Sequence, residues 1–193
     1  MNFLAHMLLS CEDSELMAGN FMADFVLNHE KKELHPNILK GIELHHSIDN
    51  FTDQHMTVKN AVSLLRPTQG KYSPVVVDIL FDYFLTINWD KYSSESLEKF
   101  TSRVYTTLML QDDVYPSRLK ELLPRMISDD FLMSCKNEDR LIKTFERIKK
   151  RAKFDNNFNR AHLDLAEFHV IMNDQFNEFF PDIVLHINTV RKC

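Results

Sequence analysis

The chain has 193 residues, of which 44% are hydrophobic and 26% are charged, and its formal net charge is −5. This length and composition are typical of one globular domain with a sizeable core, so we expect residues 1–193 to form a single domain. The net negative charge argues against a nucleic-acid-binding protein. There are only three glycines and six prolines. Sheets and hairpins usually need more turn glycines, and the composition therefore favours an all-α fold.

The cysteines and the N-terminal segment bear on the cellular compartment. Cys11, Cys135 and Cys193 are odd in number and far apart, without a CxxC pair or the spacing of a disulfide framework. A reduced, cytoplasmic location is the simplest interpretation. The segment MNFLAHMLLSCEDSE lacks a basic start and has too short an apolar run for a signal peptide. No later run approaches the roughly 20 apolar residues of a spanning helix, so we expect no membrane segment.

Apolar residues recur at helical spacing along most of the chain. The predicted helices cover residues 2–10, 13–30, 38–53, 57–65, 73–89, 93–110, 116–127, 138–154 and 159–180. Because proline removes a backbone hydrogen bond, we expect the fourth helix to end before Pro67 and the last long helix to end near Pro181, with room for a final short helix after it. The sequence has no glycine-rich phosphate loop, which argues against a P-loop or Rossmann nucleotide site.

The segment GIELHHSIDNFTDQH (41–55) carries polar residues beside its own apolar stripe. His45, Asp49 and Asp53 recur at every fourth position, so they share one face of the predicted helix. Buried, unpaired carboxylates are costly and repel one another, whereas a bound cation removes both costs. Neutral imidazole with carboxylates suits Mn, Fe or Zn. Alternatively, Asp53 caps the next helix, Asp49 pairs with an Arg or Lys, and His45 is a structural core histidine; this helix alone does not decide between them.

Three other predicted helices also place polar residues among apolar ones. Asp78 and Asp82 stand four apart inside VVVDILFDYFL, where a buried network with Lys or Arg is the alternative. Asn20 and Asp24 stand four apart in AGNFMAD, and His6 lies in NFLAHMLL. A lone histidine on an apolar helix is more often structural, so His6 gains weight only if the helices converge. Four helices of this kind together predict a metal site in a helical bundle.

The stretch from Arg140 to Arg160 is basic within an acidic chain. It contains eight Lys or Arg residues against Glu146 and Asp155. Such a stretch is either a solvated face or a surface that attracts an acidic partner or a phosphate-bearing substrate. Arg151 is a candidate phosphate ligand, because a guanidinium binds oxyanions through two hydrogen bonds.

The sequence resembles the acyl carrier protein phosphodiesterase family. The segments MNFLAH, GNFMADF, GIELHHSIDNFTDQH and VVDILFDYFL followed by NW stand in the order and spacing of that family. The resemblance covers nearly the whole chain and is most specific before about residue 90. It implies an all-helical fold similar to the HD phosphohydrolases. It also implies hydrolysis of the phosphodiester between 4′-phosphopantetheine and the carrier-protein serine, assisted by a divalent metal, commonly manganese.

The family's polar positions fall on the residues that the helical spacing also selects. They are His6, Asn20, Asp24, His45, Asp49, Asp53, Asp78 and Asp82. Two positions depart from the family pattern, with Tyr83 where a His is common and His46 where an Arg is common. The chain also lacks an adjacent His-Asp pair, which makes it an atypical relative of the HD enzymes.

These observations predict a metal-dependent phosphodiesterase in an all-α, single-domain bundle. We expect a divalent metal, Mn²⁺ first with Mg²⁺ or Fe²⁺ as alternatives, and holo acyl carrier protein as substrate. The expected metal ligands are His6, Asp24, His45, Asp49 and Asp78, and the expected catalytic residues are Asp53 and Asp82. The expected substrate contacts are Asn20, His46, Tyr83 and Arg151. The expected contacts to the acidic carrier protein are Arg147, Lys149, Lys150 and Lys153.

Two other functions fit the same residues. One is an HD-like hydrolase of a small nucleotide phosphate, which a phosphohydrolase screen would distinguish. The other is a non-catalytic module that binds carrier protein without cleaving it, and the departures at Tyr83 and His46 keep this hypothesis open.

Overall fold

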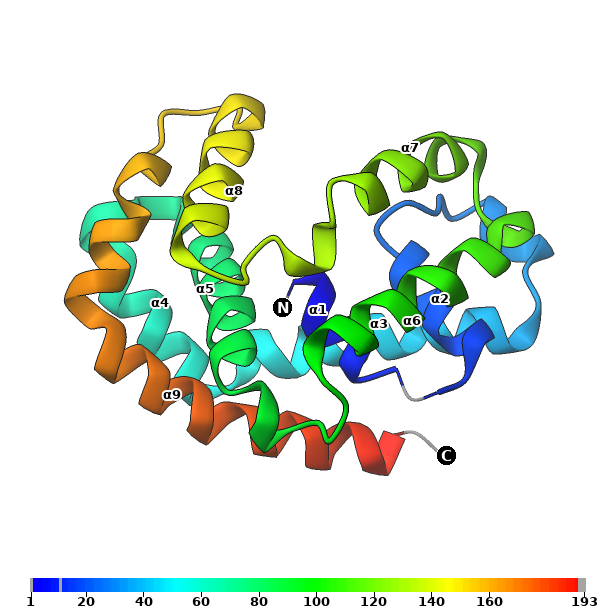
Figure 1. Ribbon diagram of the computed structural model, residues 1–193, viewed down its shortest axis with the longest axis horizontal. Coiled ribbons are helices and arrows are strands. Elements are labelled where there is room, and N and C mark those ends of the chain that lie inside the picture. The colour runs from blue at the N-terminus through cyan, green and yellow to red at the C-terminus, as the bar shows by residue number, and fades with distance from the viewer. Residues whose placement is uncertain (1, 11, 191–193) are drawn as a thin grey trace.

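The computed structural model describes residues 2–10 and 12–190 of the chain. Within this part every regular element is a helix and no strand is present, which confirms the predicted all-α class (Figure 1). The likeness to the HD phosphohydrolase fold and the single-domain organisation stay predictions. Cys11 and Cys193 lie outside the described residues, and Cys135 is buried with its thiol pKa raised by burial. A thiol of this kind is a poor nucleophile.

The helices follow one another with short connections. The α-helices are α1 Phe3–Leu8, α2 Ser14–Met22, α3 Pro36–Gln54, α4 Met56–Gln69, α5 Ser73–Ile87, α6 Leu97–Leu110, α7 Ser117–Ser128, α8 Glu138–Arg151 and α9 Ala161–Val190. Short 3-10 helices lie between them at η1 Glu30–Glu33, η2 Gly70–Tyr72, η3 Trp89–Lys91, η4 Asp112–Val114, η5 Phe131–Met133 and η6 Phe158–Arg160.

Two prolines do not end their helices, contrary to the prediction. Helix α4 continues past Pro67 to Gln69, and α9 continues past Pro181 to Val190. A proline inside a helix costs about 3 kcal/mol. In α9 this cost is offset because the buried face continues beyond the proline with Ile183 and Ile187, both fully buried. Tertiary packing therefore overrides the local break.

Helix α2 ends at Met22, earlier than the predicted end at residue 30. Its N-terminus is the predicted one, since the Asp13 side chain accepts a hydrogen bond from the Leu16 amide. The early end places Asn20 in the last turn, where backbone carbonyls lack a partner further along the helix. The Asn20 carbonyl instead accepts a hydrogen bond from His45 on α3.

Two glycines allow α2 and α3 to pack in direct backbone contact. A Cβ atom at Gly19 would overlap the Ile38 carbonyl oxygen, and one at Gly41 would overlap the Leu16 carbonyl oxygen. Only glycine therefore fits at either position of this crossing. Asn20 follows Gly19 directly, and His45 lies one turn after Gly41. The crossing thus brings their side chains within hydrogen-bond distance.

The remaining long helices build the frame around this crossing. Helix α9 packs against α3, α4 and α5, and α1 packs against both α2 and α5. Figure 1 shows α9 running along one side of the molecule and α1 near its centre. The core is rich in phenylalanine, including the fully buried Phe81, Phe176 and Phe179. Among the described helices, none combines the length and apolar character that crossing a membrane requires.

Candidate active site

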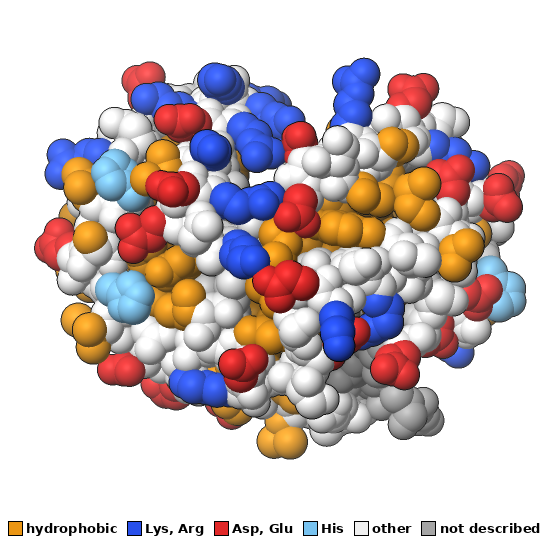
Figure 2. Space-filling view, viewed as in Figure 1, with side chains coloured by type: hydrophobic (Ala, Val, Ile, Leu, Met, Phe, Trp, Pro, Cys, Tyr) orange, Lys and Arg blue, Asp and Glu red, His pale blue; other side chains and the backbone are white. Residues whose placement is uncertain are grey.

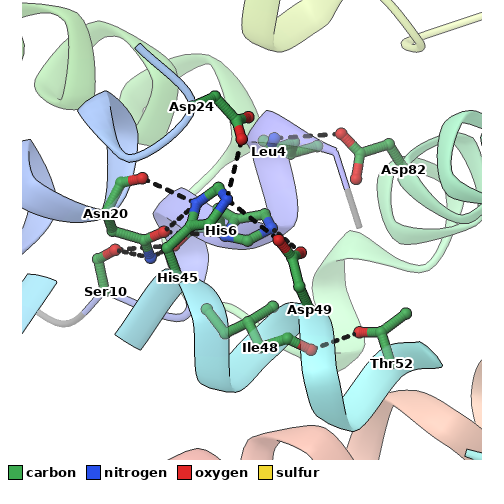
Figure 3. Close-up of polar contacts among 10 residues, drawn as sticks. All are labelled: Leu4, His6, Ser10, Asn20, Asp24, His45, Ile48, Asp49, Thr52 and Asp82. Atoms are coloured by element: carbon green, nitrogen blue, oxygen red, sulfur yellow. Dashed lines mark hydrogen bonds and ion pairs between the residues drawn. The ribbon is translucent and has the colours of Figure 1, made fainter. Parts of the chain in front are cut away.

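Three helices bring their polar side chains to one point. His6 comes from α1, Asn20 from α2, and His45 and Asp49 from α3, while Asp24 follows the end of α2 (Figure 3). The imidazole rings of His6 and His45 stack with centroids 4.3 Å apart. Both rings are almost fully buried. Helices α1, α2 and α3 therefore converge, which is the condition under which His6 counts as a candidate ligand.

Asn20 determines which nitrogen of each imidazole carries a proton. Its Nδ2 donates to the His6 carbonyl oxygen at 3.0 Å and to Ser10 Oγ at 2.8 Å. Its Oδ1 therefore faces the two rings, 2.8 Å from His6 Nδ1 and 3.1 Å from His45 Nδ1. Because a carbonyl oxygen only accepts, each Nδ1 must donate. The Nε2 atom of each neutral ring is then left with its lone pair.

The two Nε2 atoms point at carboxylates. Asp49 Oδ1 lies 3.2 Å from His6 Nε2, and Asp49 Oδ2 lies 3.1 Å from His45 Nε2. Asp24 Oδ1 lies 3.3 Å from His45 Nε2. One nitrogen from each histidine and one Asp49 oxygen lie within 4.8 Å of one another. Two imidazole nitrogens facing two carboxylates are a donor set that suits a divalent transition metal.

The pKa values describe the same site in the absence of a cation. Burial opposes protonation of His45, but hydrogen bonds to Asp24 and Asp49 outweigh it and raise its pKa to about 9. Burial dominates at His6 and lowers its pKa. Burial also opposes ionisation of Asp49, yet the two histidines beside it, His45 above all, hold its pKa well below its usual range. At neutral pH the proton on His45 thus balances the negative charge of the Asp24 and Asp49 carboxylates, which a bound cation would otherwise balance.

The site opens into a pocket of about 370 Å³. Its lining includes the five converging residues together with Asp53 from α3 and Asp78 from α5. Burial raises the pKa of Asp78, whereas Asp53 is exposed. Seven of the polar residues selected from the sequence therefore meet in one pocket, although which of them would bind a metal directly stays a prediction.

Asp82 lies beside this pocket but is not part of its lining. Its Oδ2 accepts a hydrogen bond from the Leu4 amide at 3.1 Å, in the first turn of α1 (Figure 3). Burial raises its pKa to about 7, although bonds from the Leu4 and Ala5 amides oppose that shift. This contact is typical of a carboxylate that caps a helix N-terminus. Because Asp82 does not line the pocket, no contact supports its predicted catalytic role.

The two departures from the family pattern also lie away from the pocket lining. Tyr83 is buried, with its ring edge-on to Phe84 and His169. His46 is exposed on α3, with its ring 5.7 Å from that of His45. Packing around Tyr83 offers a structural reason for that residue. The substrate contacts predicted for Tyr83 and His46 stay predictions.

The basic residues of α8 lie on a different surface. Lys and Arg side chains gather over α8 in Figure 2. Arg147 faces Asp129 at 3.5 Å, and Lys149 and Lys153 line a separate hollow that shares no residue with the pocket. Lys150 and Arg151 are exposed near the C-terminal end of α8. The substrate and partner contacts predicted for these residues stay predictions.

Ser10 is a site residue that the sequence analysis missed. Its Oγ donates to the His6 carbonyl oxygen at 2.8 Å and accepts from Asn20 Nδ2. It therefore helps to orient the amide that holds both histidines. The available signal was its position four residues after His6, which places both on one side of the N-terminal segment.

The profile of one family, acyl carrier protein phosphodiesterase, matches residues 1–183. The chain belongs to the acyl carrier protein phosphodiesterase family. A phosphodiesterase of this name from Escherichia coli O6:H1 is 27% identical over 184 residues, covering 94% of both chains. The phosphodiesterase of this name from Yersinia enterocolitica is 33% identical over 123 residues, which cover 63% of this chain and 64% of the relative. That from Photorhabdus laumondii is 37% identical over 91 residues, which cover 47% of this chain and 46% of the relative.

Membership of the acyl carrier protein phosphodiesterase family confirms the resemblance found in the sequence. It also confirms the predicted enzyme class, a phosphoric diester hydrolase. No solved structure matches the chain.

Proposed function

We propose that this enzyme hydrolyses the phosphodiester that links 4′-phosphopantetheine to a serine of holo acyl carrier protein. The products are apo carrier protein and 4′-phosphopantetheine. Family membership and the names of the relatives support this substrate. The observation that carries the proposal is the convergence of His6, His45 and Asp49, whose donor atoms lie within 4.8 Å of one another beside an open pocket.

The residues present fit a divalent cation. Asn20 leaves the Nε2 lone pair of both neutral imidazoles available, and Asp49 and Asp24 face these nitrogens. Two imidazoles favour Mn²⁺ or Fe²⁺ over Mg²⁺, which prefers oxygen ligands. We therefore place Mn²⁺ first, held by His6, His45 and Asp49 with Asp24 and Asp78 as further ligands. When bound, the cation would neutralise phosphate charge and activate a water molecule.

The chain's own residues would supply orientation and proton transfer. The water oxygen forms the new bond to phosphorus, and the bond between phosphorus and the serine oxygen breaks. Asp53, exposed at the pocket wall, is our candidate to accept the proton from water. The serine oxygen takes up a proton from solvent, to which the exposed Asp53 returns its own, so apo carrier protein regains its hydroxyl group. Asn20 holds both histidines during this step through the hydrogen bonds to their Nδ1 atoms.

Contacts outside the pocket complete the proposal. His46 and Arg151 remain candidates for substrate contact, and Arg147, Lys149, Lys150 and Lys153 for contact with an acidic carrier protein. Exposed cations on a protein of net charge −5 would reduce the repulsion between two acidic molecules. A cytoplasmic location stays the prediction from cysteine usage.

The test is the intact mass of holo acyl carrier protein after incubation with the enzyme. One sample contains Mn²⁺ and the other a chelator, and apo carrier protein serves as the mass standard. We expect loss of the phosphopantetheine mass only in the sample with metal. Equal loss in both samples would contradict metal dependence, and no loss from folded, Mn²⁺-loaded enzyme would contradict the substrate.

A further inference from the structure

A groove of about 520 Å³ leads away from the pocket along α4. It shares Asp53 and Asp78 with the pocket, so the two hollows are adjacent. Its other lining residues come from α4 and the first turn of α5, two helices that pack against each other. They are Val58, Lys59, Val62, Ser63, Arg66 and Pro74. A substrate bound at the metal ligands would extend into this groove on one side.

Besides the two aspartates that it shares with the pocket, the lining of the groove combines an apolar floor with two cations. Val58 and Val62 stand one turn apart on α4, and Pro74 adds an apolar surface from α5. Lys59 and Arg66 are exposed and stand seven residues apart, hence on the same side of α4 and about 10 Å apart along its axis. Among the described residues, neither makes an ion pair with a carboxylate.

The charge around this groove contrasts with that of the whole chain. Residues 54–77 contain no Asp or Glu, although the chain carries 28 acidic residues and a net charge of −5. The same segment carries Lys59, Arg66 and Lys71, and Lys71 lies over the Phe154 ring. The α4 side of the groove, which carries Lys59 and Arg66 and no acidic residue, is therefore complementary to an acidic ligand.

We infer that the α4 groove binds an acidic helical segment of the carrier protein beside its modified serine. This inference rests on the proposed function. Carboxylates two helical turns apart on that segment would meet Lys59 and Arg66, and an apolar side chain between them would pack on Val62. The pantetheine arm fits the groove less well, because its only charge is the phosphate, which the metal ligands would face.

The test compares charge-reversed variants in two assays. The first assay measures KM and kcat for cleavage of holo carrier protein, and kcat/KM for bis(p-nitrophenyl) phosphate, a small phosphodiester. The second measures binding of fluorescently labelled carrier protein by anisotropy, which needs no turnover. The test variant is K59E/R66E. The matched control is K32E/R125E, which reverses one exposed Lys and one exposed Arg elsewhere on the chain.

For K59E/R66E we expect KM and Kd for carrier protein to rise at least about tenfold, equivalent to about 1.4 kcal/mol. The preference for carrier protein over the small diester should fall by a similar factor, and kcat should change much less. Added salt should raise the KM of the wild type and have less effect on the variant. The control should keep the wild-type KM and Kd.

Other outcomes overturn the inference in distinguishable ways. An unchanged KM and Kd in K59E/R66E would remove the groove as the docking site. If K149E/K153E raised KM and Kd more than K59E/R66E does, the docking site would instead lie at the C-terminal end of α8. Binding without cleavage by the wild type would contradict the proposed function, while the Kd values would still test the groove. If the wild type neither binds nor cleaves carrier protein, both the groove inference and the proposed function are overturned.

Discussion

The imidazole rings of His6 and His45 stack 4.3 Å apart, with both Nδ1 atoms directed at the side-chain oxygen of Asn20. One amide therefore sets the tautomer and orientation of two histidines from different helices. The amide is itself fixed, because its Nδ2 donates to the His6 carbonyl oxygen and to Ser10. This arrangement gives Asn20 a positioning role in the candidate metal centre.

Asn20→Ala should weaken Mn²⁺ binding by about 10- to 100-fold, because His6 loses the acceptor of its Nδ1 and His45 keeps only the backbone carbonyl of residue 20. Isothermal titration of Mn²⁺ into the wild type and the variant would measure this change. Asn60→Ala, at an exposed position of α4, is a matched control. Unchanged affinity in a folded Asn20→Ala protein would show that Asn20 does not orient the ligands.

Metal affinity should rise with pH. The pKa of His45 is about 9 in the absence of a cation, so at lower pH the metal must displace a proton from His45 Nε2. The apparent association constant should therefore rise about tenfold per pH unit from about pH 7 to 9. Without metal, the ion pairs of His45 stabilise the fold fully below about pH 6.5, and this stability is lost as the pH rises through 9. Mn²⁺ titrations at several pH values would check the slope, and a flat profile would contradict it.

The pKa of Asp82 predicts a pH effect on stability. Its folded-state pKa is about 7, above the ordinary value of 3.8, so the folded protein keeps a proton that the unfolded chain loses. Its contribution to the free energy of unfolding therefore decreases as the pH rises from about 4 to 7, by up to about 1.4 kcal/mol per unit. Asp82→Asn should remove this slope and keep a side-chain acceptor for the Leu4 amide. Urea unfolding at pH 5 and pH 7.5, with chelator, would compare the two proteins, and parallel changes would contradict the shifted pKa.

The glycine crossing of α2 and α3 should not tolerate a methyl group. A Cβ atom at position 41 would overlap the Leu16 carbonyl oxygen, and backbone atoms cannot rotate away as a side chain can. Gly41→Ala should therefore lower the free energy of unfolding by about 1–3 kcal/mol, despite the better helix propensity of alanine. Chemical denaturation would measure this loss, with Asn60→Ala as the control. Equal or greater stability of Gly41→Ala would mean that the helices separate without cost.

Several features of the fold follow from sequence spacing alone. The helical class follows from apolar periodicity and few turn residues, and the pair His45 and Asp49 follows from their four-residue spacing on α3. The convergence of His6, Asn20 and His45 depends on contacts between helices that are distant in sequence. The family resemblance indicated the site residues, but the helical spacing alone could not place them in contact.

Other features depend on packing that the sequence does not reveal directly. Helix α9 continues through Pro181 because buried residues such as Ile187 lie beyond it. Asp82 shares the helical face of Asp78, yet it meets the N-terminal amides of α1 because α1 packs on α5. Two carboxylates with the same local pattern thus have different surroundings, and only the tertiary contacts distinguish them.

We propose that His6, His45 and Asp49 bind the metal on which phosphodiester cleavage depends. The most direct test measures Mn²⁺ binding by electron paramagnetic resonance and carrier-protein cleavage by intact mass, on the same samples of wild type, His45→Ala and Asp49→Asn. We predict that the wild type binds Mn²⁺ and removes the phosphopantetheine group, and that both variants lose binding and cleavage together. A folded variant that cleaves at the wild-type rate without bound Mn²⁺ would contradict the claim.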